Sequence, residues 1–334
     1  MSDAKDERNG ARRGEGASRV AAVPDARPWE LVVHQPLDRE ALRRRLHRWE
    51  PVEVIGRLPG GTNPGVVVAL NEGRRAVYCD YVRNERAWHT ECGVCRDLAE
   101  AAGAPALIDR GGDRDDRGRS VYWSLVAFVE GEADVRPGPE DVAEAIVRVA
   151  SARTYPCPGL LGEGLALTTR WATHREEYEG FMRWALGQEV VVGRLGERRL
   201  ARVRTRVVAG QEALERLGGA AYLMHGDLKD AHFVRRRVGG AWGWCLVDWE
   251  MGRAGHPLIE LGRWSASRAL SRWREESARV LQLLEARWSA GRWTQGWEVV
   301  TLYRLHTLVG TLRAGSKRDD AVAWALGAID ELLA

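Results

Sequence analysis

Two aspartates in the second half of the chain have the surroundings expected of catalytic carboxylates. Asp227 lies in the run Tyr222-Leu-Met-His-Gly-Asp-Leu-Lys-Asp-Ala-His-Phe-Val234, and Asp248 follows 21 residues later in Leu246-Val-Asp-Trp-Glu250. Each adjoins an apolar segment that can anchor it in a protein core. Phosphoryl transfer uses two such groups, one that orients an attacking hydroxyl and one that holds Mg²⁺ against nucleotide phosphates. The pair is therefore a candidate for that chemistry.

The surrounding motifs resemble those of a known family. They are similar to the H-x-D-L-x-x-x-N catalytic loop and the D-F-G motif of protein kinases. They resemble more closely the H-G-D and D-W/F-E motifs of the aminoglycoside phosphotransferase and choline kinase-like family. The segment Gly255-His-Pro-Leu-Ile-Glu-Leu261 matches that family's G-x-P-x-x-D/E-L ending. The alternative, a buried histidine with two turn-forming aspartates, leaves this third motif unexplained.

The resemblance implies a fold of the α+β class and a role for each motif residue. The fold is bilobal and protein kinase-like, with a small antiparallel-sheet N-lobe carrying one helix and a larger, mostly helical C-lobe. Asp227 is implied as the catalytic base or as the group that orients the acceptor hydroxyl, and Asp248 as a metal ligand. The family's second metal ligand is an asparagine, and His232 occupies its place here. Imidazole suits Mn²⁺ better than Mg²⁺, so Mn²⁺ is a possible alternative to Mg²⁺. His225 is expected to bond the backbone near the metal-binding turn.

Lys229 stands two residues after Asp227, where protein kinases that act on serine and threonine place a lysine that contacts the transferred phosphoryl group. This position predicts a catalytic contribution. The alternative is a solvated loop lysine, because charged loop residues are mostly exposed.

The first half of the chain supplies the predicted nucleotide site. Gly60, Gly61, Thr62 and Asn63 lie between two predicted strands and resemble the family's G-G-x-x-N turn over the phosphates. A plain β-turn is the alternative for a two-glycine hairpin. The segment Val126–Gly131 resembles the hinge between the lobes, whose backbone, at Ala127 and Val129, is expected to contact the adenine of ATP.

The strand before the predicted helix departs from the family pattern. Relatives carry a lysine there that binds the α- and β-phosphates and pairs with a helix glutamate. Cys79 stands at that point, and no lysine occurs between Lys5 and Lys229. Glu91 matches the glutamate without its expected partner. Losing a phosphate-binding cation should weaken nucleotide positioning and transition-state stabilisation. A neighbouring arginine, Arg74, Arg75 or Arg83, could supply the charge instead.

Periodicity and turn residues predict three regions. Residues 1–28 are expected to be a disordered tail, 29–131 the nucleotide-binding N-lobe, and 132–334 the helical C-lobe with the catalytic and metal-binding loops. The predicted elements are a helix at 38–49, strands at 52–55, 66–70 and 74–82, a helix at 85–102, strands at 107–108 and 121–129, and helices at 140–152, 165–186 and 197–217. A chain of 334 residues is long enough for two lobes.

Composition narrows the function classes. The formal charge of +3 is small for this length and does not indicate a nucleic-acid binder. No apolar run is long enough for a membrane span, and the polar N-terminus does not resemble a signal peptide, so we expect a cytoplasmic protein. His89, Cys92 and Cys95 could suggest zinc, but no second ligand pair follows, and the two cysteines fit the inward face of a helix.

The resulting prediction is an ATP- and Mg²⁺-dependent O-phosphotransferase acting on a hydroxyl of a small molecule or of a peptide serine or threonine. The resemblance favours a small molecule. Lys229 and the tryptophan-rich C-lobe suggest the alternative, a peptide acceptor, as in kinase-like proteins of peptide natural-product biosynthesis (thioamitides and related lanthipeptides). Such an enzyme would work on a precursor peptide with a separate phosphate lyase as partner. Abundant arginines disfavour a polycationic aminoglycoside acceptor. The alternative from another class is a pseudokinase scaffold, suggested by Cys79.

Overall fold

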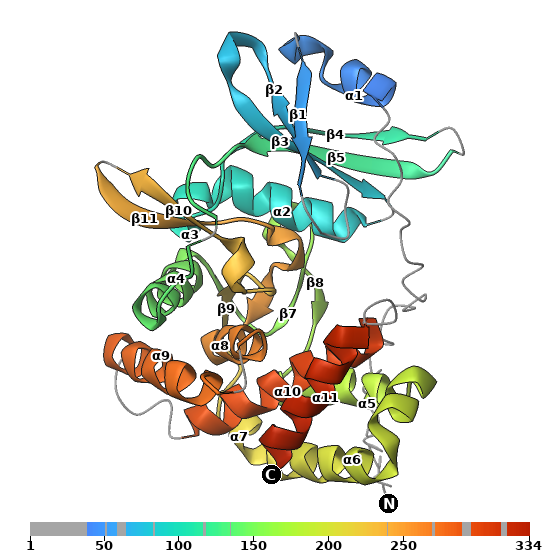
Figure 1. Ribbon diagram of the computed structural model, residues 1–334, viewed down its shortest axis with the longest axis vertical. Helices are drawn as coiled ribbons and strands as arrows, with labels where there is room; N and C mark the ends of the chain where they lie inside the picture. Colours follow the sequence, from blue (N-terminus) through green and yellow to red (C-terminus); the bar gives the residue numbers. More distant parts are fainter. Residues whose placement is uncertain are drawn as a thin grey trace, which may run out of the picture. The chain divides into compact units, whose positions relative to one another are not determined.

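The computed structural model describes residues 39–334, except 51, 59–64, 83, 116–117, 134, 239, 269–270, 289–294 and 315–318 (Figure 1). The chain separates into two units, Met1–Val33 and His34–Ala334, and all described residues belong to the second. The predicted tail at 1–28 and the predicted phosphate turn at Gly60–Asn63 lie outside the described residues.

The first half of the described chain forms one antiparallel sheet. Its strands, in spatial order, are β1 (Glu53–Arg57), β2 (Gly65–Ala69), β3 (Arg75–Val82), β5 (Ser120–Ala127) and β4 (Leu107–Arg114). Inward and outward residues alternate along β2, as expected for strands with two different faces. The predicted strands are confirmed, with β4 longer than expected.

The two faces of this sheet are covered by different helices. On one face, Leu42 of α1 (Arg39–Arg45) packs with Val66, Val68 and Leu125. On the other face, α2 (Glu85–Asp97) packs its Trp88 and Cys92 against β3 and β5. Alternate residues of β3 therefore face α2. The following helix, α3 (Ala99–Ala102), ends at Gly103 in the left-handed conformation, φ 74°, which glycine adopts readily.

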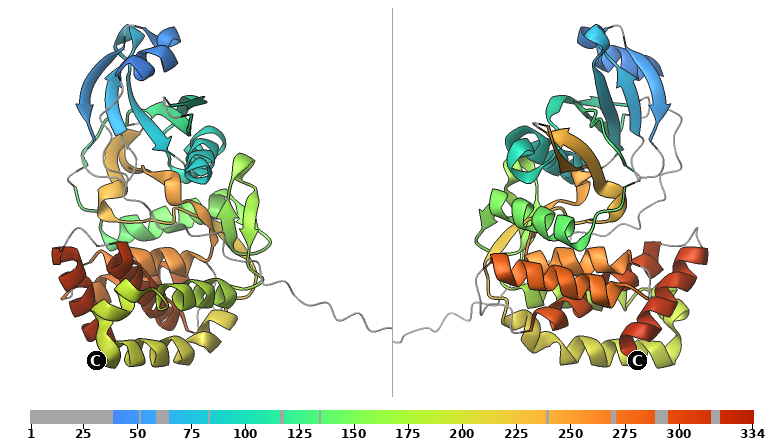
Figure 2. Two further views of the ribbon diagram at one scale, coloured as in Figure 1. Left: turned by 90° about the vertical axis from the view of Figure 1, so that its right-hand side faces the viewer. Right: turned by 60° about the vertical axis from the view of Figure 1, so that its left-hand side comes forward.

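The rest of the chain is mostly helical. Its helices are α4 (Pro139–Ala152), α5 (His174–Ala185), α6 (Glu189–Ala209), α7 (Gln211–Glu215), α8 (Pro257–Ala266), α9 (Trp273–Arg287), α10 (Gly296–Ala314) and α11 (Asp319–Leu333). Helices α8 and α10 lie side by side in this half (Figure 2). Trp264 of α8 and Leu305 of α10 are buried in its core. None of the described helices is long and apolar enough to cross a membrane.

Short strands among these helices position the motif residues. One five-stranded sheet has the order β6 (Thr154–Tyr155), β9 (Ala221–Met224), β12 (Arg253–Gly255), β7 (Gly159–Leu161) and β8 (Leu167–Arg170). The hairpin of β10 (Phe233–Val238) and β11 (Ala241–Leu246) stands apart from it. The loop with Asp227 leaves β9, and Asp248 follows β11, so both aspartates lie where strands end.

The helix predicted for 165–186 is wrong in its first half. Leu167–Arg170 forms β8, and α5 begins only at His174. The β-branched pair Thr168 and Thr169 favours a strand, and the side chain of Thr173 caps α5 by accepting from the amide of Glu176 at 3.1 Å. The prediction missed this cap. The other predicted helices are present with different bounds. The helix predicted at 38–49 ends as an α-helix at Arg45, and the one at 85–102 is divided into α2 and α3. The one at 197–217 is divided into α6, which already begins at Glu189, and α7.

Candidate active site

The loop after β9 has a backbone shape that requires glycine at one position. Gly226 has φ +82°, and a Cβ atom there would lie 1.9 Å from the carbonyl oxygen of Met251. Only glycine avoids both the positive-φ strain and this clash. The close approach packs the loop of Asp227 directly against the segment that follows Asp248.

Glu260, in the first turn of α8, is hydrogen-bonded to the backbone of this loop. Its buried carboxylate accepts hydrogen bonds from the amides of His225, at 3.0 Å, and Gly226, at 2.9 Å. Burial raises the pKa of Glu260 to about 7, although Arg263 and the two amides act in the opposite direction. Arg263 also donates to the carbonyl oxygen of Gly226. Two backbone amides and one backbone carbonyl of the loop are therefore bonded to side chains of α8.

His225 joins the two motif segments. Its Nε2 lies 2.9 Å from the carbonyl oxygen of Val247, the residue before Asp248. Because the carbonyl can only accept, Nε2 carries the proton. Burial, together with the neighbouring His232, lowers the pKa of His225 to about 4, so the ring is neutral near pH 7. The predicted backbone bond is confirmed.

Asp248 has a strained backbone. It is one of two described non-glycine residues with positive φ, at 68°, and it leads into the turn Trp249–Met251. Such strain persists at sites where the surrounding structure enforces it. Burial raises the pKa of Asp248, but the hydrogen bond and charge of His232 outweigh it, and the net pKa lies below its ordinary value. The carboxylate is therefore ionised near neutral pH.

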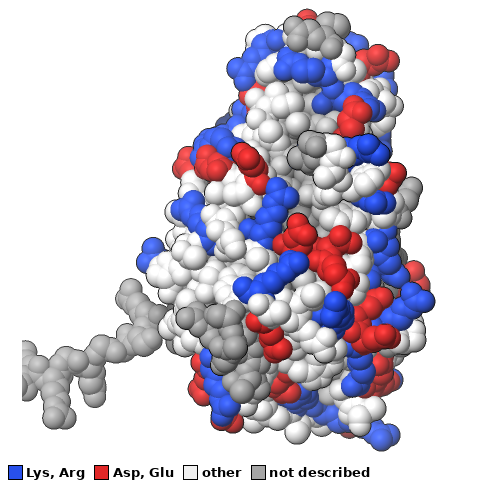
Figure 3. Space-filling model, turned by 90° about the vertical axis from the view of Figure 1, so that its left-hand side faces the viewer, with Lys and Arg blue, Asp and Glu red and all other residues white. Residues whose placement is uncertain are grey.

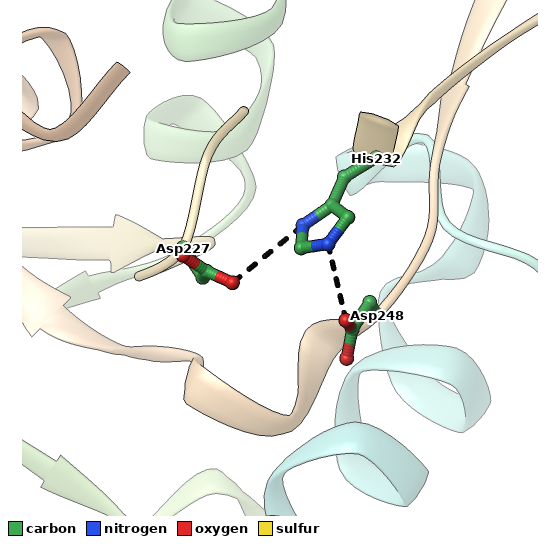
Figure 4. Close-up of side chains that lie close together, drawn as sticks. All are labelled: Asp227, His232 and Asp248. Atoms are coloured by element: carbon green, nitrogen blue, oxygen red, sulfur yellow. Dashed lines mark ion pairs between the residues drawn. The ribbon is translucent and has the colours of Figure 1, made fainter. Parts of the chain in front are cut away.

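Asp227, His232 and Asp248 converge from the two segments (Figure 4). His232 Nε2 lies 3.1 Å from Asp248 Oδ2, and its Nδ1 lies 4.0 Å from Asp227 Oδ2. One ligand atom from each residue falls within 4.8 Å of the others, and this is the only such group among the described residues. The buried Nδ1 has no hydrogen-bond partner in the described part of the chain. Two carboxylates and an imidazole are donors that fit a divalent cation such as Mn²⁺ or Mg²⁺, and Nε2 is the ring nitrogen that lies beside Asp248.

Lys229 lies beside the same carboxylate. Its Nζ is 2.8 Å from Asp227 Oδ2, and the two side chains are 42% and 43% exposed. An ion pair this exposed contributes little to stability. The lysine reaches the part of the site where the predicted chemistry would occur, and its catalytic contribution stays a prediction.

The strand-three position carries no cation. Cys79 and Tyr81 of β3 face α2, where Tyr81 donates its hydroxyl proton to Glu91 Oε2 at 2.5 Å. Burial raises the pKa of Glu91 to about 8, and the charge of Asp248 adds to the shift. Burial likewise raises the pKa of the Cys79 thiol well above its ordinary value. A neutral Tyr81–Glu91 contact replaces the expected lysine–glutamate pair.

The arginines considered as substitutes have other contacts. Arg75 bonds Glu130 at 2.5 Å and lies over the ring of Phe128. Arg74 bonds the side chain of Asn71 at 3.0 Å. Arg83 lies outside the described residues. These contacts hold Arg74 and Arg75 at other groups than Cys79.

The predicted hinge follows β5. The amide of Ala127 donates to the carbonyl oxygen of Ala106 at 2.8 Å, so the carbonyl of Ala127 is the group left for an adenine. Val129 lies in the connection between β5 and α4, which also contains the predicted lobe boundary after residue 131. Their nucleotide contacts stay predictions.

The zinc alternative gains no support. Cys92 and Cys95 are buried, free thiols on α2, as expected for packing residues. His89 lies 3.6 Å from Glu85 on the same helix. The described residues place no three ligands of this set together.

Sequence reasoning missed three residues of the site. Tyr81 shares the strand face of Cys79, and its spacing of two residues would have indicated the contact with Glu91. Asp230, between Lys229 and His232, could have been singled out as a charge inside the catalytic loop. Arg263 gave no comparable signal, because its contact with Gly226 depends on the packing of α8.

Comparison with known proteins gives one matching family and several solved structures with the same fold. The sequence model of the phosphotransferase enzyme family (APH) matches residues 54–303. A thermostable mutant of aminoglycoside phosphotransferase APH(4)-Ia, in ternary complex with ADP and hygromycin B, is similar with a TM-score of 0.62. The two are 18% identical, over 88% of this chain and 97% of that chain.

Two further structures have the same fold. The microcompartment-associated aminopropanol kinase has a TM-score of 0.65 at 12% identity, over 89% of this chain and 95% of that chain. A putative fructosamine-3-kinase from Thermobifida fusca YX-ER1 has a TM-score of 0.58 at 16% identity, over 87% and 97%. No curated protein sequence matches the chain. These likenesses agree with the small antiparallel sheet and the helical second half.

Proposed function

This chain belongs to the phosphotransferase enzyme family, and from that premise we propose that it transfers the γ-phosphate of ATP to a hydroxyl group of a small molecule. The observation that carries the proposal is the convergence of Asp227, His232 and Asp248 from two separate segments. His232 and Asp248 would hold Mg²⁺ or Mn²⁺, and Asp227 would orient the acceptor. The bound cation would neutralise charge on the nucleotide phosphates.

The proposed step forms a bond between the acceptor oxygen and the γ-phosphorus, while the bond from that phosphorus to the oxygen of ADP breaks. The hydroxyl proton passes to the carboxylate of Asp227. This requires Asp227 to be held within hydrogen-bond reach of the acceptor. The contacts of Glu260 with the loop backbone supply that rigidity. Lys229, beside Asp227, would stabilise charge on the transferred group.

ATP as donor is supported by the relative that binds ADP and by the predicted hinge. The carbonyl of Ala127 and the backbone of Val129 are the proposed adenine contacts. The neutral surroundings of Cys79 and Glu91 leave the phosphates without a cation from β3. The metal ion and Lys229 would then have to neutralise the charge of the phosphates.

The acceptor is better matched by a neutral or weakly charged alcohol than by a polycation. Three carboxylates of the helical half form ion pairs with arginines instead of facing an acceptor: Glu177 with Arg253, Glu179 with Arg175, and Glu276 with Arg268. The face with the β10–β11 hairpin and α4 shows acidic and basic side chains intermixed (Figure 3). Such a surface provides no strong field of one sign to attract a polycation.

One observation favours a second candidate, a pseudokinase that binds nucleotide without transfer. This is the uncharged set Cys79, Tyr81 and Glu91 at the place of the lysine–glutamate pair. The retained Asp227 and Asp248 argue for the enzyme.

The test is transfer of labelled phosphate from ATP with Mg²⁺ or Mn²⁺, offered to small alcohols, aminoglycosides and a Ser/Thr-containing precursor peptide. Turnover that disappears in Asp227→Asn supports the enzyme. Tight nucleotide binding without transfer or hydrolysis supports the pseudokinase. Label found only on the peptide would replace the small-molecule acceptor with a peptide, and absence of nucleotide binding contradicts both candidates.

A further inference from the structure

Asp230, in the catalytic loop, is held by three donors, two from the end of α8 and the residues that follow it and one from the segment before α4. Its Oδ1 accepts from Trp264 Nε1 of α8 at 3.1 Å. Its Oδ2 accepts from Arg136 Nε at 2.8 Å, from the segment before α4, and from Arg268, which follows α8. Because hydrogen bonds to a charged carboxylate are strong, these three bonds hold the Asp230 side chain in one position.

Arg268 makes this contact hard to break. The side chain is only 2% exposed, so its charge must be compensated inside the protein. It bonds Glu276 at 2.5 Å on its other side and lies over the ring of Trp264, 4.3 Å from the ring centroid. The guanidinium is therefore clamped between two carboxylates and an indole, and it holds Asp230 in one position.

Asp230 begins a single helical turn that separates Lys229 from His232. The amide of His232 donates to the carbonyl oxygen of Lys229 at 2.9 Å and closes this turn. The amide of Val247 donates to the carbonyl oxygen of His232 at 3.0 Å and ties the turn to the segment of Asp248. A shift of Asp230 would therefore also move Lys229 and His232, whose side chains lie near the carboxylate of Asp227.

We propose that Asp230, through its clamp by Arg268, Trp264 and Arg136, is a positioning residue that sets where Lys229 and His232 lie relative to Asp227. The inference rests on the proposed function for its catalytic consequence. Asp230 acts through the backbone of the turn, because its carboxylate is engaged by these three donors. Arg136 also connects the turn to the chain segment that leads from the hinge to α4.

Two variants separate positioning from stability. Asp230→Asn keeps the size of the side chain but leaves Arg268 with one carboxylate, so it should lower thermal stability. The double variant Asp230→Asn with Arg268→Met removes both charges, and methionine retains contact with Trp264. Without Arg268, Glu276 is the remaining charge of this cluster, but its side chain is 19% exposed and can be hydrated, so this variant should still fold.

The readouts are hydrogen exchange of the metal-free protein and Mn²⁺ binding in the presence of ADP. In the double variant, we expect the amides of 229–233 to exchange about tenfold faster and Mn²⁺ to bind about tenfold more weakly, as for the loss of groups that orient metal ligands. Exchange elsewhere and the affinity for ADP alone should stay unchanged. Arg279→Ala, which breaks the exposed pair with Glu140, is the matched control and should change neither readout.

Wild-type exchange at 229–233 in the double variant would overturn the inference, and so would a uniform increase over the whole C-terminal half, which indicates a structural role alone. Failure of the wild type to bind Mn²⁺ and nucleotide contradicts the proposed function instead. In that case hydrogen exchange still decides whether Asp230 orders the turn.

Discussion

The two sides of the candidate site hold their polar groups in different ways. On the C-terminal side, Asp227 and Asp248 lie around His232, and the loop backbone is bonded to buried side chains. On the strand side, Tyr81 and Glu91 form a neutral contact beside Cys79. Charged groups on a strained backbone are typical of functional sites. The strand side, with its buried and neutral side chains, instead resembles a packed core. The chain thus concentrates its charge at the place where phosphoryl transfer would occur.

The largest expected effect comes from the charged side. In Asp248→Asn, kcat should fall by about 10³-fold, because a bound cation supplies several kcal/mol of transition-state stabilisation. Mn²⁺ binding with ADP should be lost. Asparagine tolerates the left-handed backbone of this position, so the melting temperature should stay near that of the wild type. Full turnover in a folded Asp248→Asn protein would remove this aspartate from the mechanism.

A smaller loss is expected for Lys229→Ala. One hydrogen bond to a charged group is worth about 1.5–3 kcal/mol, so kcat should fall by about ten- to one-hundredfold while KM for the acceptor stays the same. Stability should not change, because the ion pair with Asp227 is exposed. Lys229→Arg, with the charge kept, is the control and should recover part of the rate. An unchanged rate in the alanine variant assigns the lysine to the solvated surface.

The same contrast explains what the sequence could predict. Asp227, His232 and Asp248 lie next to strand ends in short local motifs, so the resemblance of those motifs to the family's was enough to single out all three. The backbone bond of His225 was predictable for the same reason. The clamp on Asp230 was not, because Arg268 and Glu276 reach it from distant positions through tertiary packing.

On the strand side, the sequence indicated what was missing but not what replaced it. The absence of lysine at Cys79 was evident from composition, but the replacement of an ion pair by a neutral hydrogen bond was not. Whether Glu91 is ionised depends on burial and on Asp248, and both are properties of the folded chain. Likewise, β8 was mistaken for a helix because the cap at Thr173 depends on where the chain turns after the strand.

Restoring the missing charge would test the strand side directly. Cys79→Lys places an ammonium beside Glu91, so the carboxyl should ionise and pair with it. Since a charge-assisted bond to phosphate adds about 1.5–3 kcal/mol, kcat/KM for ATP should rise by about tenfold or more. Cys79→Met, of similar length without charge, is the control for crowding against Gly65, where the cysteine sulfur already lies close. Equal effects of lysine and methionine would mean that packing, rather than charge, limits this side.

The smallest effect on turnover is expected for Glu91→Gln. The pKa of Glu91 is about 8 in the folded protein and 4.5 is the ordinary value for the unfolded chain, so the folded state binds the extra proton between these pH values. Stability of the wild type should therefore fall as pH rises from about 4.5 to about 8, by up to roughly 1.4 kcal/mol per pH unit from this group. Glutamine is neutral throughout, and its carbonyl can accept the Tyr81 hydroxyl. Turnover at pH 7 should stay within about threefold, which is roughly 0.6 kcal/mol in the barrier.

The measurement is the melting temperature of metal-free wild type and Glu91→Gln from pH 5 to pH 8. At pH 5 both folded proteins carry a neutral side chain at this position, and the difference between their melting temperatures should be smallest. Towards pH 8 the glutamine variant should gain relative to the wild type, because only the wild type must hold a proton that its unfolded chain has released. Tyr81→Phe removes the hydrogen-bond donor and should leave the direction of this trend intact, since burial is the larger cause of the raised pKa. A constant difference across the range would mean that Glu91 is ionised in the folded protein, and the strand side would then carry a buried negative charge next to Asp248.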